Sequence, residues 1–209
     1  MLLYYITDRQ QFSGNGEERS LRLLDKIEQA ALSEVNFVQL REKDLSAQEL
    51  YQFARESLSR IRRHGGKTRL LINSRTDVAL AVGADGVHLR SDDVTPEDVR
   101  AIWRKAGGTG TPIIGISCHT EDEVTTAEQA GADFVVFGSV FEKKDDFTSH
   151  PTGLEELGAV CRHQIPVLAL GGVTLKNAVQ CVEAGARGIA GIRLFQEGDL
   201  ASTVRALRQ

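Results

Sequence analysis

The chain has 209 residues, a formal net charge of -4 and a hydrophobic fraction of 41%. These values suit one globular domain with a sizeable core. The acidic balance argues against a nucleic-acid-binding protein, which would need clustered basic charge. No apolar run is long enough to span a bilayer, and the first residues show no basic n-region of a signal peptide, so no membrane partner is expected.

The cysteines predict neither a disulfide framework nor a zinc site. They are Cys118, Cys161 and Cys181, an odd number and widely spaced, without the paired spacing that either would require. A reducing, cytoplasmic setting is therefore expected. The sequence does not fix the oligomeric state, and a homo-oligomer stays open.

A repeated pattern runs through the chain. Each copy follows an amphipathic stretch, opens with glycine (Glu34 in the first copy) and continues as a short apolar run; the copies are residues 34–40, 83–89, 131–137 and 185–191. Glycine at that point suits the left-handed residue that ends a helix. The apolar run that follows predicts a buried strand.

Other apolar runs and helical patterns fill the intervals. Near-continuous apolar runs predict parallel strands covered on both faces at residues 3–7, 69–73, 112–118 and 166–170. Helices are predicted over residues 21–32, 47–62, 76–81, 96–105, 121–129, 153–161, 175–183 and 200–207.

Eight strands alternating with eight helices predict a parallel (β/α)8 TIM barrel. Residues 1–209 would form this single domain, because no composition shift marks a boundary. A doubly wound open sheet is the alternative. In a barrel the carboxyl ends of the strands would form the active face.

Cationic residues follow the second predicted strand. Gln39, Arg41 and Lys43 alternate, so they share a face if the strand extends that far. Two cations on one face suit a phosphate or diphosphate. The alternative is a pair of charges at the rim, held in solvated ion pairs.

Three further strand ends carry residues suited to anion, metal or proton chemistry. Gly171-Gly172 would let backbone N–H groups approach an anion, or would form a simple tight turn. Asp93 would hold Mg²⁺ beside a diphosphate, or would serve as an acid at a helix N-terminus. His119 would move protons near neutral pH, or would be structural. Its neighbour Cys118 points to the opposite side and is expected to pack.

Taken together, these segments resemble the thiamine-phosphate synthase/TenI family. The motifs, in chain order, are VQLREK at 38–43, LINSRTDVAL at 71–80, GVHL at 86–89, IGISCHT at 114–120 and LALGGV at 168–173. The resemblance implies a (β/α)8 barrel and one of two activities. The synthase joins hydroxymethylpyrimidine diphosphate to a thiazole phosphate with Mg²⁺. The TenI-type tautomerase aromatises a thiazole carboxylate phosphate by proton transfer, without a metal.

The resemblance also implies roles for individual residues. Gln39, Arg41, Lys43 and Asn73 match the diphosphate and pyrimidine contacts, Asp93 a Mg²⁺ ligand, Ser117 a polar pocket residue, Gly171 and Gly172 the thiazole-phosphate loop, and His119 the tautomerase acid/base.

Three departures from the synthase pattern stand out. Ser74 replaces an aspartate after the third strand, which should weaken Mg²⁺ binding. The Thr-x-Thr-Lys loop after the sixth strand is missing, although Lys143 or Lys144 would still supply charge there. Arg193 stands in place of a serine and would either clamp a phosphate or obstruct the pocket.

Three hypotheses follow. The first is a thiazole tautomerase that needs no cofactor, in which His119 shuttles the proton. The phosphate and carboxylate contacts would then come from Gly171, Gly172 and Arg193, and from Arg41 and Lys43. The alternative is the Mg²⁺-dependent synthase, with thiazole phosphate and the pyrimidine diphosphate as its partners. A third hypothesis is a non-catalytic sensor of a phosphorylated ligand.

Overall fold

The protein is a closed barrel of eight parallel strands. The computed structural model describes residues 1–142 and 151–209. In them β1 (Leu2–Ile6) pairs with both β2 and β8, and every other strand pairs with its neighbours in the chain. The remaining strands are β2 (Phe37–Leu40), β3 (Arg69–Asn73), β4 (Gly86–Arg90), β5 (Ile113–Cys118), β6 (Phe134–Phe137), β7 (Val167–Ala169) and β8 (Gly188–Gly191). The predicted TIM barrel is confirmed, and the open-sheet alternative is wrong.

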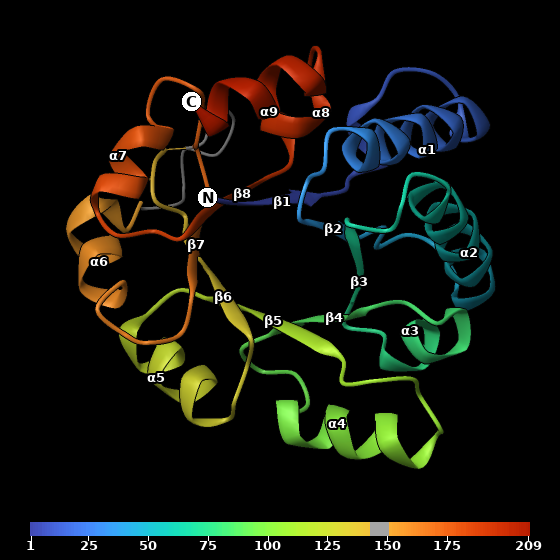
Figure 1. Ribbon diagram of the computed structural model, residues 1–209, viewed down its shortest axis with the longest axis horizontal. Coiled ribbons are helices and arrows are strands. Elements are labelled where there is room, and N and C mark those ends of the chain that lie inside the picture. The colour runs from blue at the N-terminus through green and yellow to red at the C-terminus, as the bar shows by residue number, and fades with distance from the viewer. Residues whose placement is uncertain (143–150) are drawn as a thin grey trace.

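Helices surround this barrel (Figure 1). They are η1 (Arg9–Gln11), α1 (Gly16–Leu32), α2 (Ala47–Arg63), α3 (Thr76–Val82), α4 (Pro96–Lys105), α5 (Glu121–Gln129), α6 (Gly153–Val160), α7 (Ala178–Glu183), α8 (Arg193–Gln196) and α9 (Leu200–Arg208). In the described part of the chain no helix combines the length and the apolarity that crossing a membrane requires.

The repeated pattern marks the junction between a helix and the next strand, as predicted. Gly83, Gly131 and Gly185 have φ of 69°, 75° and 106°, and Glu34 in the first copy has φ of 56°. All four lie in the left-handed region that reverses the chain after a helix. The strand begins three residues after each of them.

Two short helices were not predicted, and one predicted helix starts late. The short helices η1 and α8 are too brief to show a helical period. The predicted helix 175–183 begins only at Ala178, because Asn177 holds the preceding turn. Its Oδ1 accepts a hydrogen bond from the Thr174 N–H at 2.7 Å, a local bond that competes with helix formation.

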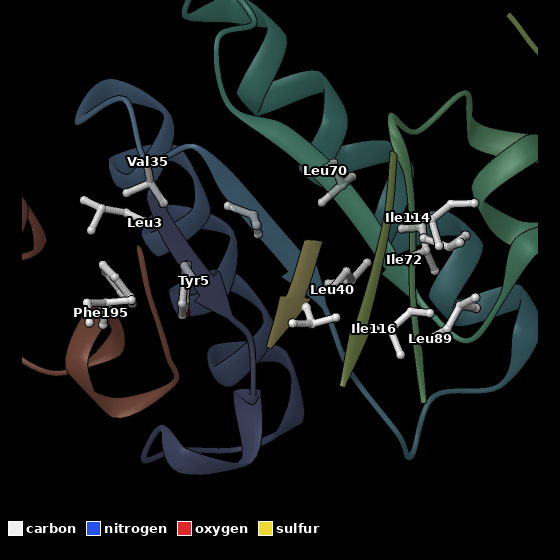
Figure 2. Packing of buried hydrophobic residues seen from close by; sticks show 14 of the residues in the cluster. Leu3, Tyr5, Val35, Leu40, Leu70, Ile72, Leu89, Ile114, Ile116 and Phe195 are labelled. Atoms are coloured by element: carbon white, nitrogen blue, oxygen red, sulfur yellow. The ribbon is translucent and has the colours of Figure 1, made fainter. Parts of the chain in front are cut away.

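Two apolar layers stabilise the barrel. The larger layer lies between the strands and the helices and includes Leu3, Tyr5, Leu40 and Ile72, shown in Figure 2. The smaller layer fills the barrel interior, where buried side chains from several strands pack together: Tyr4, Ile6, Leu71, Phe134, Val136, Leu168 and Ala190. Because the interior is filled, a ligand can enter only at the mouth.

Candidate active site at the carboxyl ends of the strands

A large pocket opens at the carboxyl ends of the strands. Its volume is about 1230 Å³. The predicted site residues that line it are Gln39, Arg41, Lys43, Asn73, Ser117, His119, Gly171, Gly172 and Arg193. Asp93 is absent from this lining, and Lys143 lies outside the described residues. Residues from five strand ends therefore meet at one mouth, as the barrel predicted.

The cationic edge of the pocket, formed by Arg41 and Lys43, is anchored by a buried acidic residue between them. β2 ends at Leu40, so Arg41 and Lys43 lie in the loop beyond the strand and still line the pocket. Glu42 between them is buried. It accepts hydrogen bonds from the Thr7 hydroxyl at 2.6 Å and from the Arg9 N–H at 3.0 Å.

The Thr7 hydroxyl also accepts a hydrogen bond from the backbone N–H of Arg41 at 3.0 Å. Arg9 pairs through Nη1 with Glu42 at 3.1 Å and with Asp44 at 2.6 Å. Burial raises the pKa of Glu42, although the hydrogen bonds from Thr7 and Arg9 oppose that rise. This anchor fixes the loop that presents the two cations.

The Gly171-Gly172 turn is built for close backbone approach. The two glycines have φ of 93° and 63°. A Cβ at Gly171 would collide with Ser139, and one at Gly172 would lie 2.5 Å from the Glu142 carbonyl oxygen. Asn177 supports the turn by donating a hydrogen bond to the Gly172 carbonyl at 3.1 Å. Only glycine fits here, and this holds for a turn that binds an anion as well as for a simple tight turn, so the anion-binding role stays a prediction.

His119 has a defined tautomer when it is neutral. Its Nδ1–H donates to the Gly138 carbonyl oxygen, which can only accept, so the lone pair lies on Nε2. Its backbone N–H donates to Glu123, which also accepts a hydrogen bond from Ser91 at 2.8 Å. Burial tends to raise the pKa of Glu123, but these hydrogen bonds outweigh it and the pKa is lowered. The ring at the pocket wall thus offers a proton acceptor.

Asp93 is engaged by its neighbours. Its Oδ2 accepts hydrogen bonds from the Ser74 hydroxyl at 2.6 Å and from the Arg90 N–H at 3.0 Å. Both bonds leave Oδ1 for another partner. Within residues 1–142 and 151–209 no three His, Cys, Asp or Glu side chains gather as a metal cluster. The donor set fits Mg²⁺ only as one carboxylate that shares the ion with phosphate oxygens of a bound substrate.

Arg193 takes a different place from the one expected, whereas Cys118 takes the expected one. Arg193 is the first residue of α8 and not the end of β8, because β8 stops at Gly191. It lines the pocket, and whether it clamps a phosphate stays a prediction. Cys118 is fully buried in the outer apolar layer, which confirms it as a packing residue. Burial raises the pKa of its thiol to about 12.

Sequence reasoning missed a buried polar network beneath the pocket. Tyr4 and His88 lie in the barrel interior and contact Gln39 and Ser117 of the pocket lining. Burial, and then the nearby Arg41 charge, lower the pKa of His88 to about 3. The signal was present, because His88 is a polar residue inside an otherwise apolar strand.

A closed parallel barrel with a pocket at the carboxyl ends of its strands defines a TIM-barrel protein. The chain belongs to the thiamine monophosphate synthase family, whose model matches residues 3–195. This confirms the resemblance seen in the sequence.

Relatives and solved structures agree with this assignment. A provisionally named thiamine-phosphate synthase of Geobacter sulfurreducens is 40% identical, covering 98% of this chain and 92% of its own. The thiamine-phosphate synthase of Syntrophomonas wolfei is 36% identical over 99% and 94% of the two chains. The thiamine phosphate pyrophosphorylase of Pyrococcus furiosus superposes with a TM-score of 0.81 at 30% identity, covering 99% of this chain and 93% of that one.

Proposed function

We propose that this protein is a thiamine-phosphate synthase, which joins hydroxymethylpyrimidine diphosphate to a thiazole phosphate and releases diphosphate. The observation that carries the proposal is one pocket lined by two separate groups of residues that suit anions. Arg41 and Lys43 lie after β2, whereas Gly171 and Gly172 lie after β7. A volume of about 1230 Å³ exceeds the usual range for one small ligand. The names of the relatives support the same activity.

The residues divide the reaction between them. Arg41 and Lys43 bind the diphosphate and stabilise its charge as the bond from the pyrimidine methylene to oxygen breaks. The Gly171-Gly172 backbone holds the thiazole phosphate, so that the thiazole nitrogen faces the same methylene carbon and forms the new bond. Mg²⁺, when bound, would neutralise charge on the diphosphate, and Asp93 is the carboxylate that would hold it.

The first hypothesis from the sequence, a thiazole tautomerase, is the second candidate. It is favoured by His119, whose Nε2 lone pair suits proton transfer, and by Ser74 in place of a metal-binding acid. The tautomerase would bind a phosphate with only one of these two groups of residues. For that reason, and because the relatives are named as synthases, we place it second.

Parallel assays of both reactions, with Mg²⁺ and with EDTA, test the proposal. We expect thiamine phosphate to form only with Mg²⁺, and Arg41→Ala to reduce the rate at least tenfold. Arg69→Ala is the matched control, because Arg69 opens β3 at the other end of the barrel, where it pairs with Asp85 at 3.1 Å. Turnover of the thiazole carboxylate in EDTA that is lost in His119→Ala would favour the tautomerase instead. Ligand binding without either turnover would favour the sensor.

A further inference from the structure

A chain of hydrogen bonds crosses the barrel interior beneath the pocket. Gln39 Nε2 on β2 donates to the Tyr4 hydroxyl on β1 at 3.1 Å. That hydroxyl lies 3.1 Å from Nδ1 of His88 on β4. Nε2 of His88 lies 2.9 Å from the Ser117 hydroxyl on β5. Gln39 and Ser117 line the pocket, whereas Tyr4 and His88 lie below it.

The interior partners are closed off from solvent. Tyr4 is fully buried and His88 is 2% exposed. The Tyr4 ring meets the Phe134 ring edge to face, with centroids 5.4 Å apart. Gly115 leaves room for the histidine, because a Cβ there would lie 2.9 Å from His88 Nδ1. With water excluded, each polar atom has to be satisfied by its neighbour in the chain.

The direction of the hydrogen bonds follows from their donors. Gln39 donates to Tyr4, so the single hydroxyl proton of Tyr4 is available for His88 Nδ1. A neutral imidazole that accepts on one nitrogen carries its proton on the other. His88 therefore donates from Nε2 to Ser117. Its lowered pKa, which burial causes first, keeps the ring in this neutral form.

The hydrogen-bond chain therefore fixes which group at the floor of the pocket donates to a ligand and which accepts from it. Ser117 accepts from His88, so its own proton is free to donate to a ligand, while Gln39 Oε1 is left to accept. We propose that Tyr4 and His88 are positioning residues that set which of these two groups donates and which accepts. The statement about the ligand rests on the proposed function and adds to it that the pyrimidine ring occupies this floor.

The tautomer of His88 can be read directly by ¹⁵N NMR of the full-length protein. We expect a protonated Nε2 and an unprotonated Nδ1 at pH 7, with the signals assigned by their loss in His88→Gln. Tyr4→Phe should remove the partner of Nδ1 and shift the ring toward the other tautomer. Tyr5→Phe is the matched control: its hydroxyl bonds Gln196 at 3.0 Å outside the barrel, so the His88 signals should not move.

A protonated Nδ1 in the unmodified protein would reverse the direction of the chain and overturn the proposal. An unchanged tautomer in Tyr4→Phe would overturn it as well. Circular dichroism and a thermal melt of each variant show whether it is folded. The control variant shows whether loss of a buried tyrosine hydroxyl alone moves the ring.

Kinetics test the consequence for the ligand. Tyr4→Phe should raise KM for the pyrimidine diphosphate about tenfold, the effect of one misdirected buried hydrogen bond, and leave KM for the thiazole phosphate unchanged. Equal changes in both constants would contradict a role in positioning. If the unmodified protein forms no thiamine phosphate but shows the expected tautomer, the proposed function fails while the assignment of polarity stands.

Discussion

Burial of a neutral His88 predicts a specific loss of stability in mild acid. The pKa of His88 is lowered to about 3, first by burial and then by Arg41, with Asp93 opposing. In the unfolded chain an ordinary histidine titrates near pH 6.5. Below that value the unfolded state binds a proton that the folded state refuses. The contribution of His88 is thus complete above about pH 6.5 and is lost progressively as the pH falls toward 3.

The size of the effect at pH 5 depends mainly on the unfolded state, because the folded ring is still neutral there. Because pH 5 lies about 1.5 units below the pKa of histidine in the unfolded chain, the free energy of unfolding falls by roughly 2 kcal/mol. For a chain of 209 residues this is a fall of about 4–8 °C in Tm.

Urea unfolding of the unmodified protein and of His88→Gln, at pH 7.5 and pH 5.0, measures this loss. The variant is expected to be less stable at pH 7.5, since it loses the contacts with Tyr4 and Ser117. The difference in free energy of unfolding between the two proteins should then be about 2 kcal/mol smaller at pH 5.0 than at pH 7.5, because every other titrating group is common to both. A difference that is the same at both pH values would refute the reasoning and show that the buried ring accepts a proton.

Three other substitutions test the anchor, the metal carboxylate and the glycine turn. Glu42→Ala should lower the free energy of unfolding by about 3 kcal/mol in urea titrations, because it removes a buried partner of Arg9; a loss below about 1 kcal/mol would contradict the anchor. Ser74→Asp should tighten Mg²⁺ binding at least tenfold by calorimetry with diphosphate present, since Asp tolerates the left-handed φ of 53° at this position; unchanged affinity would place the ion elsewhere. Gly172→Ala should weaken inorganic phosphate binding and cost about 2 kcal/mol or more in stability, and wild-type behaviour in both measurements would argue against the turn as the phosphate site.

The barrel could be predicted because its signals are local. Each strand is a short apolar run, and before four of them a left-handed residue ends the preceding helix, whether it is glycine or Glu34. The strand-end residues followed from topology alone, since closure of parallel strands brings Arg41, His119 and Gly171 to one mouth.

The contacts across the barrel could not be predicted in the same way. Tyr4 and His88 are 84 positions apart, and they meet because of strand tilt and register, which no local pattern encodes. Asp93 was predicted as a Mg²⁺ ligand or as an acid at a helix N-terminus, and its hydrogen bond with Ser74 depends on how two loops lie against each other. α8 is only four residues long, so the place of Arg193 at its start left no periodic signal.

In the loop after β2, different residues fix the path of the backbone and contact the ligand. Thr7, Arg9 and Glu42 fix the path of the loop from the inside, while Arg41 and Lys43 meet the ligand from the outside. Because alternate residues carry the two tasks, the outward pair can be exchanged for other side chains while the inward set preserves the shape of the loop. The scaffold is therefore suited to being retuned for differently charged ligands, by natural drift or by deliberate redesign, with little effect on its folding.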